Sequence, residues 1–196
     1  MDVDEILDFV SLLNKFRAVT RIVTVAGENR DENDAEHSFQ LAMLAWYILS
    51  SGKYDLDKDL VIKYALIHDF VEVHAGDTSF YRSESESNEK KRRENESAKR
   101  LQGDFGRFED LHELIERYEE RNDQESRFVY ALDKVVPILN IYLDGGSDWR
   151  KHQVTLDMLI EAKESKVALS PEVETFYREL LKILKENRHL FHEKQE

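Results

Sequence analysis

The sequence has no cysteine, and it contains only two prolines and seven glycines among its 196 residues. The absence of cysteine excludes disulfides and thiolate-bound metal ions. Any metal site must therefore use histidine, aspartate or glutamate, a ligand set that suits Mn, Mg, Fe, Co, Ni or Zn. The scarcity of proline and glycine permits long, uninterrupted helices.

Long hydrophobic runs are also missing. No apolar segment approaches the roughly 18 residues that indicate a membrane-spanning helix. The first residues, Met-Asp-Val-Asp-Glu-Ile, lack the basic start and apolar core of a signal peptide. We therefore expect a cytoplasmic protein that does not have a membrane as a partner.

Basic residues are outnumbered by acidic ones. The chain has 28 lysines and arginines against 41 aspartates and glutamates, which gives a net charge of −13. Duplex nucleic acid is bound through a basic surface, so this balance argues against it as a partner. A small phosphorylated substrate remains compatible, because a metal ion and one or two arginines can make a pocket locally positive.

Apolar residues recur at helical spacing along most of the chain, and we find no strand pattern and no internal repeat. The predicted helices span residues 3–16, 34–50, 58–73, 108–121, 124–143, 149–164 and 171–188. No segment resembles a linker between domains. The sequence thus predicts an all-α single domain over residues 1–196, with a core of about 5–185 and a polar tail at 189–196.

One apolar stretch, residues 65–78, is unusually rich in ionisable groups: His68, Asp69, Glu72 and Asp77. Burying charge without a partner is costly, and a metal ion is the simplest partner for an adjacent histidine and aspartate. On a helix over 58–73, Glu72 would lie beside His68, and Asp69 would be rotated by about 100° from it. The stretch is therefore a candidate for half of a metal site.

Two further helices place a polar group in an apolar setting. His37 lies near the start of helix 34–50, which we expect Asp34 to cap, and Asp133 lies within the apolar helix 124–143. The simpler interpretations are a partly buried polar histidine and an aspartate paired with Lys134. If they join the central stretch, the ligands suit a hard-to-borderline ion that lowers the pKa of bound water and neutralises a phosphoryl oxygen.

Two segments allow two interpretations each. The arginines between residues 17 and 30 are either surface charge or an anion-binding loop just before His37, where an arginine could clamp a phosphate. Residues 82–100 are either a solvated loop leading into a charged helix, which we favour, or a lid over the site.

Three motifs together carry a family resemblance. They are Asn33-Asp34-Ala35-Glu36-His37-Ser38, then His68-Asp69-Phe70-Val71-Glu72-Val73-His74-Ala75-Gly76-Asp77, then Leu132-Asp133-Lys134. In this order the chain resembles the HD-domain metal-dependent phosphohydrolases and, more closely, the YfbR-like 5′-deoxynucleotidases. A His-Asp pair alone is a weak signal, but the added Glu, Gly-Asp, Glu-His and Asp-Lys elements make the resemblance specific.

The resemblance implies an HD-type helical bundle, a homodimer, and one divalent metal ion (Co, Mn, Mg, Fe, Ni or Zn). It implies the metal ligands His37, His68, Asp69 and Asp133. It also implies that Glu72 and Asp77 serve catalysis, that Asp77 contacts the substrate, and that Arg21, with Arg17 as the alternative, binds the phosphate. Bacterial members have tryptophan after this arginine, whereas this chain has Ile22, which bears on deoxyribose selectivity.

We therefore expect a metal-dependent hydrolase of nucleoside 5′-monophosphates, chiefly deoxyribonucleoside forms. One alternative is another HD-type reaction, on cyclic nucleotides or pyrophosphates. Cyclic-nucleotide enzymes often add histidines for a second metal ion, and here only His74 falls near the motif. Another alternative is a non-catalytic helical module that binds a metal ion or whose polar residues are purely structural.

Overall fold

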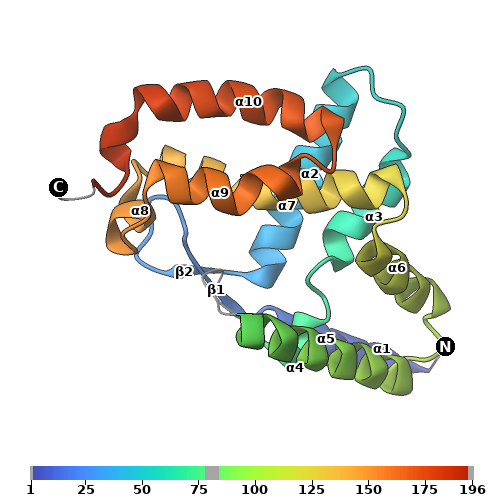
Figure 1. The fold of residues 1–196 in the computed structure, drawn as a ribbon. Helices are drawn as coiled ribbons and strands as arrows, with labels where there is room; N and C mark the ends of the chain where they lie inside the picture. The colour runs from blue at the N-terminus through green and yellow to red at the C-terminus, as the bar shows by residue number, and fades with distance from the viewer. Residues whose placement is uncertain (1, 78–83, 194–196) are drawn as a thin grey trace.

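The computed structural model describes residues 2–77 and 84–193, and its fold is mainly helical (Figure 1). The helices are α1 (Val3–Phe16), α2 (Asp34–Ser51), α3 (Lys58–Ile67), α4 (Glu72–Ala75), α5 (Glu84–Asp104), α6 (Glu109–Glu120), α7 (Gln124–Leu143), α8 (Ser147–Lys151), α9 (Leu156–Val167) and α10 (Pro171–Glu186), followed by the 3₁₀ turn η1 (Arg188–Leu190). Strands β1 (Thr20–Thr24) and β2 (Asp31–Asn33) form a two-stranded antiparallel sheet. Among the described residues no helix is long and apolar enough to cross a membrane.

Helix α7 forms the centre of the main hydrophobic core. Helices α2, α3, α9 and α10 contribute buried side chains to the same core, and Figure 1 shows α9 and α10 running side by side along one face of the molecule. The α7 side chains that are almost completely shielded from solvent are Phe128, Val129, Ala131, Leu132, Val135, Val136 and Ile138. The many apolar side chains of α7 are therefore buried in the core of the protein.

A second, smaller core lies along the opposite face, where α1, α4 and α5 run together (Figure 1). It joins Leu12 and Phe16 of α1 to Leu101 of α5 and to Phe70 and Val71, which follow α3. The chain between α3 and α4 therefore passes from one core to the other. His68 and Asp69 lie at this seam between the two hydrophobic clusters.

The all-α expectation is confirmed, and five predicted helices match α1, α2, α6, α7 and α10 to within two residues at each end. The predicted cap of α2 is wrong by one residue. Asn33 is the N-cap: its side chain accepts hydrogen bonds from the backbone N–H groups of Ala35 and Glu36, and the Glu36 side chain bonds back to Asn33 N–H. Asp34 is instead the first helical residue, and its carboxylate faces the site.

The predicted helix over 58–73 is interrupted. Helix α3 ends at Ile67, and the next residues form tight turns in which Phe70 N–H bonds to Ile67 C=O and Glu72 N–H bonds to Asp69 C=O. These bonds span three residues, which winds the backbone more tightly than an α-helix does. Glu72 consequently starts the separate helix α4 and does not share a helix face with His68.

The predictions were also wrong for the strands and for helix 149–164. Strand β1 holds the β-branched run Thr20–Thr24 and pairs with the polar segment Asp31–Asn33, whose residue types rarely form strands, so this pairing depends on tertiary context. Residues 149–164 are divided between α8 and α9, because Thr155 caps a new helix by accepting a hydrogen bond from Met158 N–H.

The charged segment 82–100 and the C-terminal tail differ from the structures predicted for them. Of residues 82–100, those from Glu84 onward are helical, as part of α5, and residues 82 and 83 lie outside the described part. The predicted polar tail contains Phe191, which is buried and stacks on Trp149 with ring centroids 4.1 Å apart. Residues 194–196 are not described.

The main core sets the stability of the domain. Leu41 of α2 is completely buried, whereas Leu143 at the end of α7 is 76% exposed. We expect Leu41→Ala to lower the free energy of unfolding by about 2–5 kcal/mol, because it removes buried methyl groups and leaves a cavity. The matched change Leu143→Ala should alter it by less than about 0.5 kcal/mol. Urea denaturation followed by circular dichroism measures both, and equal effects would contradict this description of the core.

Candidate metal centre

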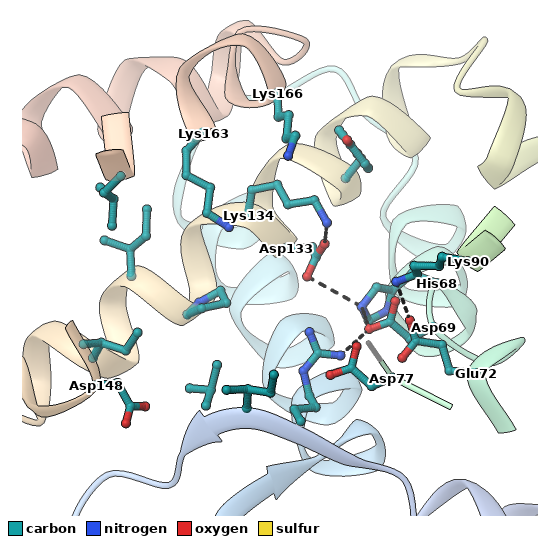
Figure 2. Close-up of a pocket in the computed structure, with 18 of the residues that line it drawn as sticks. His68, Asp69, Glu72, Asp77, Lys90, Asp133, Lys134, Asp148, Lys163 and Lys166 are labelled. Atoms are coloured by element: carbon teal, nitrogen blue, oxygen red, sulfur yellow. Dashed lines mark hydrogen bonds and ion pairs between the residues drawn. The ribbon is translucent and has the colours of Figure 1, made fainter. Parts of the chain in front are cut away.

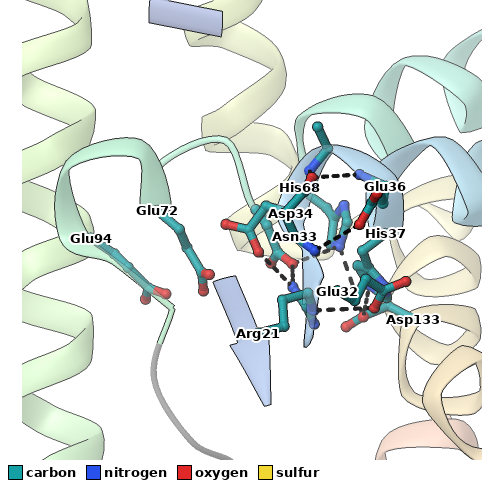
Figure 3. A network of polar contacts seen from close by, with 12 residues as sticks. Arg21, Glu32, Asn33, Asp34, Glu36, His37, His68, Glu72, Glu94 and Asp133 are labelled. Carbon is teal, nitrogen blue, oxygen red and sulfur yellow. Dashed lines mark hydrogen bonds and ion pairs between the residues drawn. The ribbon is translucent and has the colours of Figure 1, made fainter. Parts of the chain in front are cut away.

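The small sheet carries Arg21 to the seam between the two cores. Its Nη1 atom donates to Asp69 Oδ2 at 2.5 Å. It also donates to Asp34 Oδ1 at 3.1 Å, and Figure 3 shows Arg21 beside Asp34. Burial lowers the pKa of the guanidinium, but the carboxylates around it, above all Asp69, more than offset this and raise the pKa of Arg21. Arg21 is therefore a permanent positive charge inside a group of acids. Arg17, the alternative phosphate ligand, is exposed at the end of α1.

Side chains from α2, from the turn after α3 and from α7 converge beside Arg21. His37 Nε2 lies 2.9 Å from Asp133 Oδ1, and His68 Nε2 lies 3.0 Å from Asp69 Oδ2 and 3.8 Å from Asp133 Oδ1. One donor atom from each of the four residues lies within 4.8 Å of the others. The four residues could therefore coordinate a single ion.

The outer hydrogen bond of His68 orients its imidazole toward this point. His68 Nδ1 lies 2.9 Å from the carbonyl oxygen of Ala65, which assigns the proton to Nδ1 and leaves the Nε2 lone pair facing the cluster. His37 Nδ1 faces Glu32 Oε2 at 3.5 Å without a hydrogen bond, while its Nε2 atom lies 2.9 Å from Asp133 Oδ1. With the proton on Nδ1, the buried Nε2 atom of His68 cannot donate to Asp69 Oδ2 3.0 Å away, and it has no hydrogen bond among the described residues. A divalent cation would satisfy this atom.

The two aspartates are held in their charged form. Burial alone would raise the pKa of Asp69, but His68 and Arg21 hold it well below its usual range. Asp133 is similar: burial opposes ionisation, while Lys134, whose Nζ is 2.5 Å from Oδ2, and His37 lower the pKa. Two carboxylates and two imidazoles form the nitrogen and oxygen donor set that first-row divalent ions accept.

Glu72 lies next to the cluster at the first position of α4 and is 2% exposed. Its Oε1 accepts a hydrogen bond from Lys90 Nζ of α5 at 2.8 Å. Burial first, and then the nearby charge of Asp69, raise the pKa of Glu72 to about 9. The group can thus carry a proton at neutral pH, which suits an acid–base role.

A cavity of about 700 Å³ opens over these groups (Figure 2). The candidate residues that line it are Arg21, His68, Asp69, Glu72, Asp77 and Asp133, and Ile22 lines it as well. His37 is fully buried and extends from α2 to the cluster without lining the cavity. Apart from Arg17, the structure therefore brings together the residues that the sequence proposed for the site.

Some residues at the site were not singled out from the sequence. Asp34 and Glu32 face Arg21, at 3.1 Å and 3.8 Å, and Lys90 holds Glu72. Both acids lie within five residues of His37 along the chain, and this closeness is the signal in the sequence that could have pointed to them. Nothing local to α5 indicated Lys90, because only the packing of α5 on α4 brings it to Glu72.

A second group of donors, Asp34, Asp69 and Glu72, also lies within 4.8 Å. Arg21 and Lys90 already contact all three carboxylates, so side chains supply part of the positive charge that this group needs. His74 belongs to neither group of donors found among the described residues.

Comparison with known proteins agrees with this geometry. The model of the HD domain family matches residues 13–174. The chain is 32% identical over 139 residues to human 5′-deoxynucleotidase HDDC2, covering 68% of this chain and 65% of that protein, and 28% identical over 142 residues to the Danio rerio protein of the same name, covering 71% and 69%. The matched region thus spans about two thirds of these relatives.

A solved structure described as a predicted metal-dependent phosphohydrolase from Magnetospirillum magnetotacticum MS-1 superposes on the chain with a TM-score of 0.82. The two are 27% identical, and the match covers 97% of this chain and 96% of that one. The resemblance seen in the motifs is confirmed, and the expectation of a metal-dependent phosphohydrolase gains support. Because the family model spans all the residues gathered at the cluster, we conclude that this chain belongs to the HD domain family.

Proposed function

We propose that the chain is a metal-dependent phosphohydrolase that releases phosphate from nucleoside 5′-monophosphates, chiefly deoxyribonucleoside forms. The observation that carries the proposal is the convergence of four donor residues within 4.8 Å, with Arg21 bonded to one of them, at the wall of a cavity of about 700 Å³. The names of the similar human and fish proteins direct the proposal to deoxynucleotides.

His37, His68, Asp69 and Asp133 would hold one divalent ion, which is Co, Mn, Mg, Fe, Ni or Zn. Bound there, the ion would supply Lewis-acid chemistry to a phosphoryl oxygen. Its two positive charges would balance the two aspartates. Asp133 is 4% exposed and the Asp69 side chain is 17% exposed, so keeping both carboxylates charged is costly without such a partner.

The remaining groups have separate roles. Arg21, held in place by Asp34 and Glu32, binds the phosphate with the planar donor fork that suits phosphate oxygens. Glu72, held by Lys90, exchanges protons with the attacking water or the leaving oxygen, and Asp77 at the cavity wall contacts the substrate. In the reaction, water supplies the new oxygen on phosphorus, the ester P–O bond breaks, and the released alcohol takes up a proton.

The sugar preference depends on Ile22. This side chain is 44% exposed and lines the cavity next to Arg21, at the position where bacterial members have tryptophan, so we expect a preference for deoxyribose that is not strict. We therefore place deoxyribonucleotides first and ribonucleotides second. The cytoplasmic location stays a prediction from the sequence.

A phosphate-release assay tests the substrate class. Purified protein is incubated, in turn with each candidate divalent ion, with deoxy- and ribonucleoside 5′-monophosphates, cyclic nucleotides and nucleotides that contain a pyrophosphate. We expect release of inorganic phosphate from the 5′-monophosphates, and more from the deoxy forms. Cleavage of only the cyclic or pyrophosphate compounds would replace the proposal with another HD-type reaction. A protein that takes up no stoichiometric metal on titration would not be this enzyme.

Three variants test the assigned roles. We expect His68→Ala or Asp69→Ala to abolish both metal binding and turnover. Glu72→Ala should retain the metal and lose about 100-fold or more in kcat, the usual contribution of a general acid or base. Glu96→Ala, which removes an exposed carboxylate of α5, is the matched control. Metal content by mass spectrometry and turnover are measured on the same samples. Full activity of Glu72→Ala on every phosphoester tested would refute its catalytic role.

We also propose that the protein is a homodimer. The α7 residues are used in the core, but the outer side of α2 exposes a stripe of large apolar side chains: Phe39, Met43, Trp46 and Tyr47. Their spacing places them on one face of the helix, and contiguous exposed apolar surface of this kind marks protein interfaces. A second copy of the chain, presenting the same face, would cover it.

Light scattering coupled to size-exclusion chromatography tests the dimer. We expect a mass of about twice 23.1 kDa for the wild type. Trp46→Glu, which puts a charge in the stripe, should give the monomer mass. Leu169→Glu, at a comparably exposed leucine after α9, should leave the dimer intact. A monomeric wild type would refute the proposal.

A further inference from the structure

Three lysines line the site cavity and have no part in the mechanism described above. Lys134 comes from α7, and Lys163 and Lys166 come from α9; we refer to the three as the lysine wall. Figure 2 shows Lys163 and Lys166 extending from α9 toward Lys134 and Asp133. The lysine wall is therefore part of the same cavity as the metal cluster and lies on the side beyond Asp133.

Placing these ammonium groups close together in a cavity wall disfavours their protonated, charged forms. Burial first, and then the positive charge of Lys134, lower the pKa of Lys163 to about 7 and also lower that of Lys166. Lys163 and Lys166 are three residues apart, so they are neighbours on one face of α9, an arrangement that destabilises a helix when both carry the same charge. Such placement weakens the fold, and a bound anion would reverse the effect.

The charges closer to the metal cluster serve the groups at the hydrolysed phosphate. A divalent ion would balance Asp69 and Asp133, while Arg21 contacts Asp34 and Lys90 contacts Glu72. In the wall itself, Lys134 bonds to Asp133, and the charge of that same aspartate acts on both α9 lysines. The wall thus concentrates positive charge at one side of a cavity, in a chain whose net charge is −13.

We propose that the lysine wall binds a second phosphate of the substrate, separate from the phosphoryl group that is hydrolysed at the metal cluster. This inference rests on the proposed function and extends its substrates to nucleotides that carry a second phosphate. Lysine suits the role, because its ammonium is a compact charge on a flexible stem and adapts to a phosphate from several directions.

The second phosphate can be attached at two places. It is either a 3′-phosphate on the sugar of a 5′-nucleotide or the next phosphate of a 5′-diphosphate. With the 3′,5′-bisphosphate, water adds to the 5′-phosphorus, the ester P–O bond breaks, and the products are inorganic phosphate and the nucleoside 3′-phosphate. With the diphosphate, water breaks the bond between the two phosphates and gives the monophosphate and inorganic phosphate.

The test compares three nucleotides of one base: deoxyadenosine 5′-monophosphate, its 3′,5′-bisphosphate and the 5′-diphosphate. For the wild type we expect kcat/KM for one of the two-phosphate compounds to exceed that for the monophosphate by about tenfold or more, which corresponds to one charge-assisted hydrogen bond. Lys163→Gln combined with Lys166→Gln should reduce this ratio to near one. Whichever compound shows the advantage identifies the position of the second phosphate.

Two controls accompany the double variant. Lys163→Arg with Lys166→Arg keeps both charges and should keep most of the advantage, whereas Lys182→Gln removes an exposed lysine of α10 and should not change the ratio. Thermal unfolding verifies that each variant is folded. Loss of activity by the same factor on all three nucleotides would place the lysines at the hydrolysed phosphate and overturn the inference, as would a wild-type ratio near one.

Binding provides a readout that does not need turnover. Calorimetry with the metal-loaded wild type should show tighter binding of the favoured two-phosphate nucleotide than of the monophosphate, and the double glutamine variant should lose that difference. If the protein hydrolyses none of the three compounds, the proposed function fails while this binding comparison still decides the role of the wall. If it hydrolyses the monophosphate but binds all three equally, only the present inference fails.

Discussion

The structure depends on one electrostatic constraint: the carboxylates of Asp133, which is buried, and of Asp69, which is largely buried, lie between two hydrophobic cores. Two charged carboxylates at such a seam need positive partners, because an uncompensated buried charge is strongly unfavourable. Arg21 and Lys134 supply part of this charge at 2.5 Å each, and two imidazoles face the same point. The Nε2 atom of His68, which has no hydrogen bond among the described residues, marks where a cation could complete the arrangement.

The seam also explains how one domain presents so many polar groups. Ala65 packs in the main core and Phe70 in the smaller one, so the residues between them are fixed at both ends by apolar packing. The tight turns after α3 then direct His68 and Asp69 inward. Side chains held by rigid elements on both sides keep their geometry without a ligand, which is what a preorganised site requires.

Around this centre, positive side chains form two separate groups. Arg21 and Lys90 each contact a carboxylate next to the candidate ligands, whereas Lys163 and Lys166 lie on the far side of Asp133. The difference lies in their surroundings: the first two stabilise neighbouring acids, and the second two oppose one another and Lys134. Under the proposed roles, the first group acts at the hydrolysed phosphate and the second group binds another phosphate in the same cavity.

The sequence by itself determined the helical class and the donor residues. The spacing of apolar residues predicted α7 over Gln124–Leu143, because helical periodicity can be read directly from the sequence. Polar residues within apolar segments likewise pointed to the candidate ligands His37, His68, Asp69 and Asp133. Only the tertiary structure decided that Glu32 and Asp34 hold Arg21, that Lys90 holds Glu72, and that α9 faces Asp133. Those contacts join segments that packing brings together, and no local pattern encodes which distant side chains will meet.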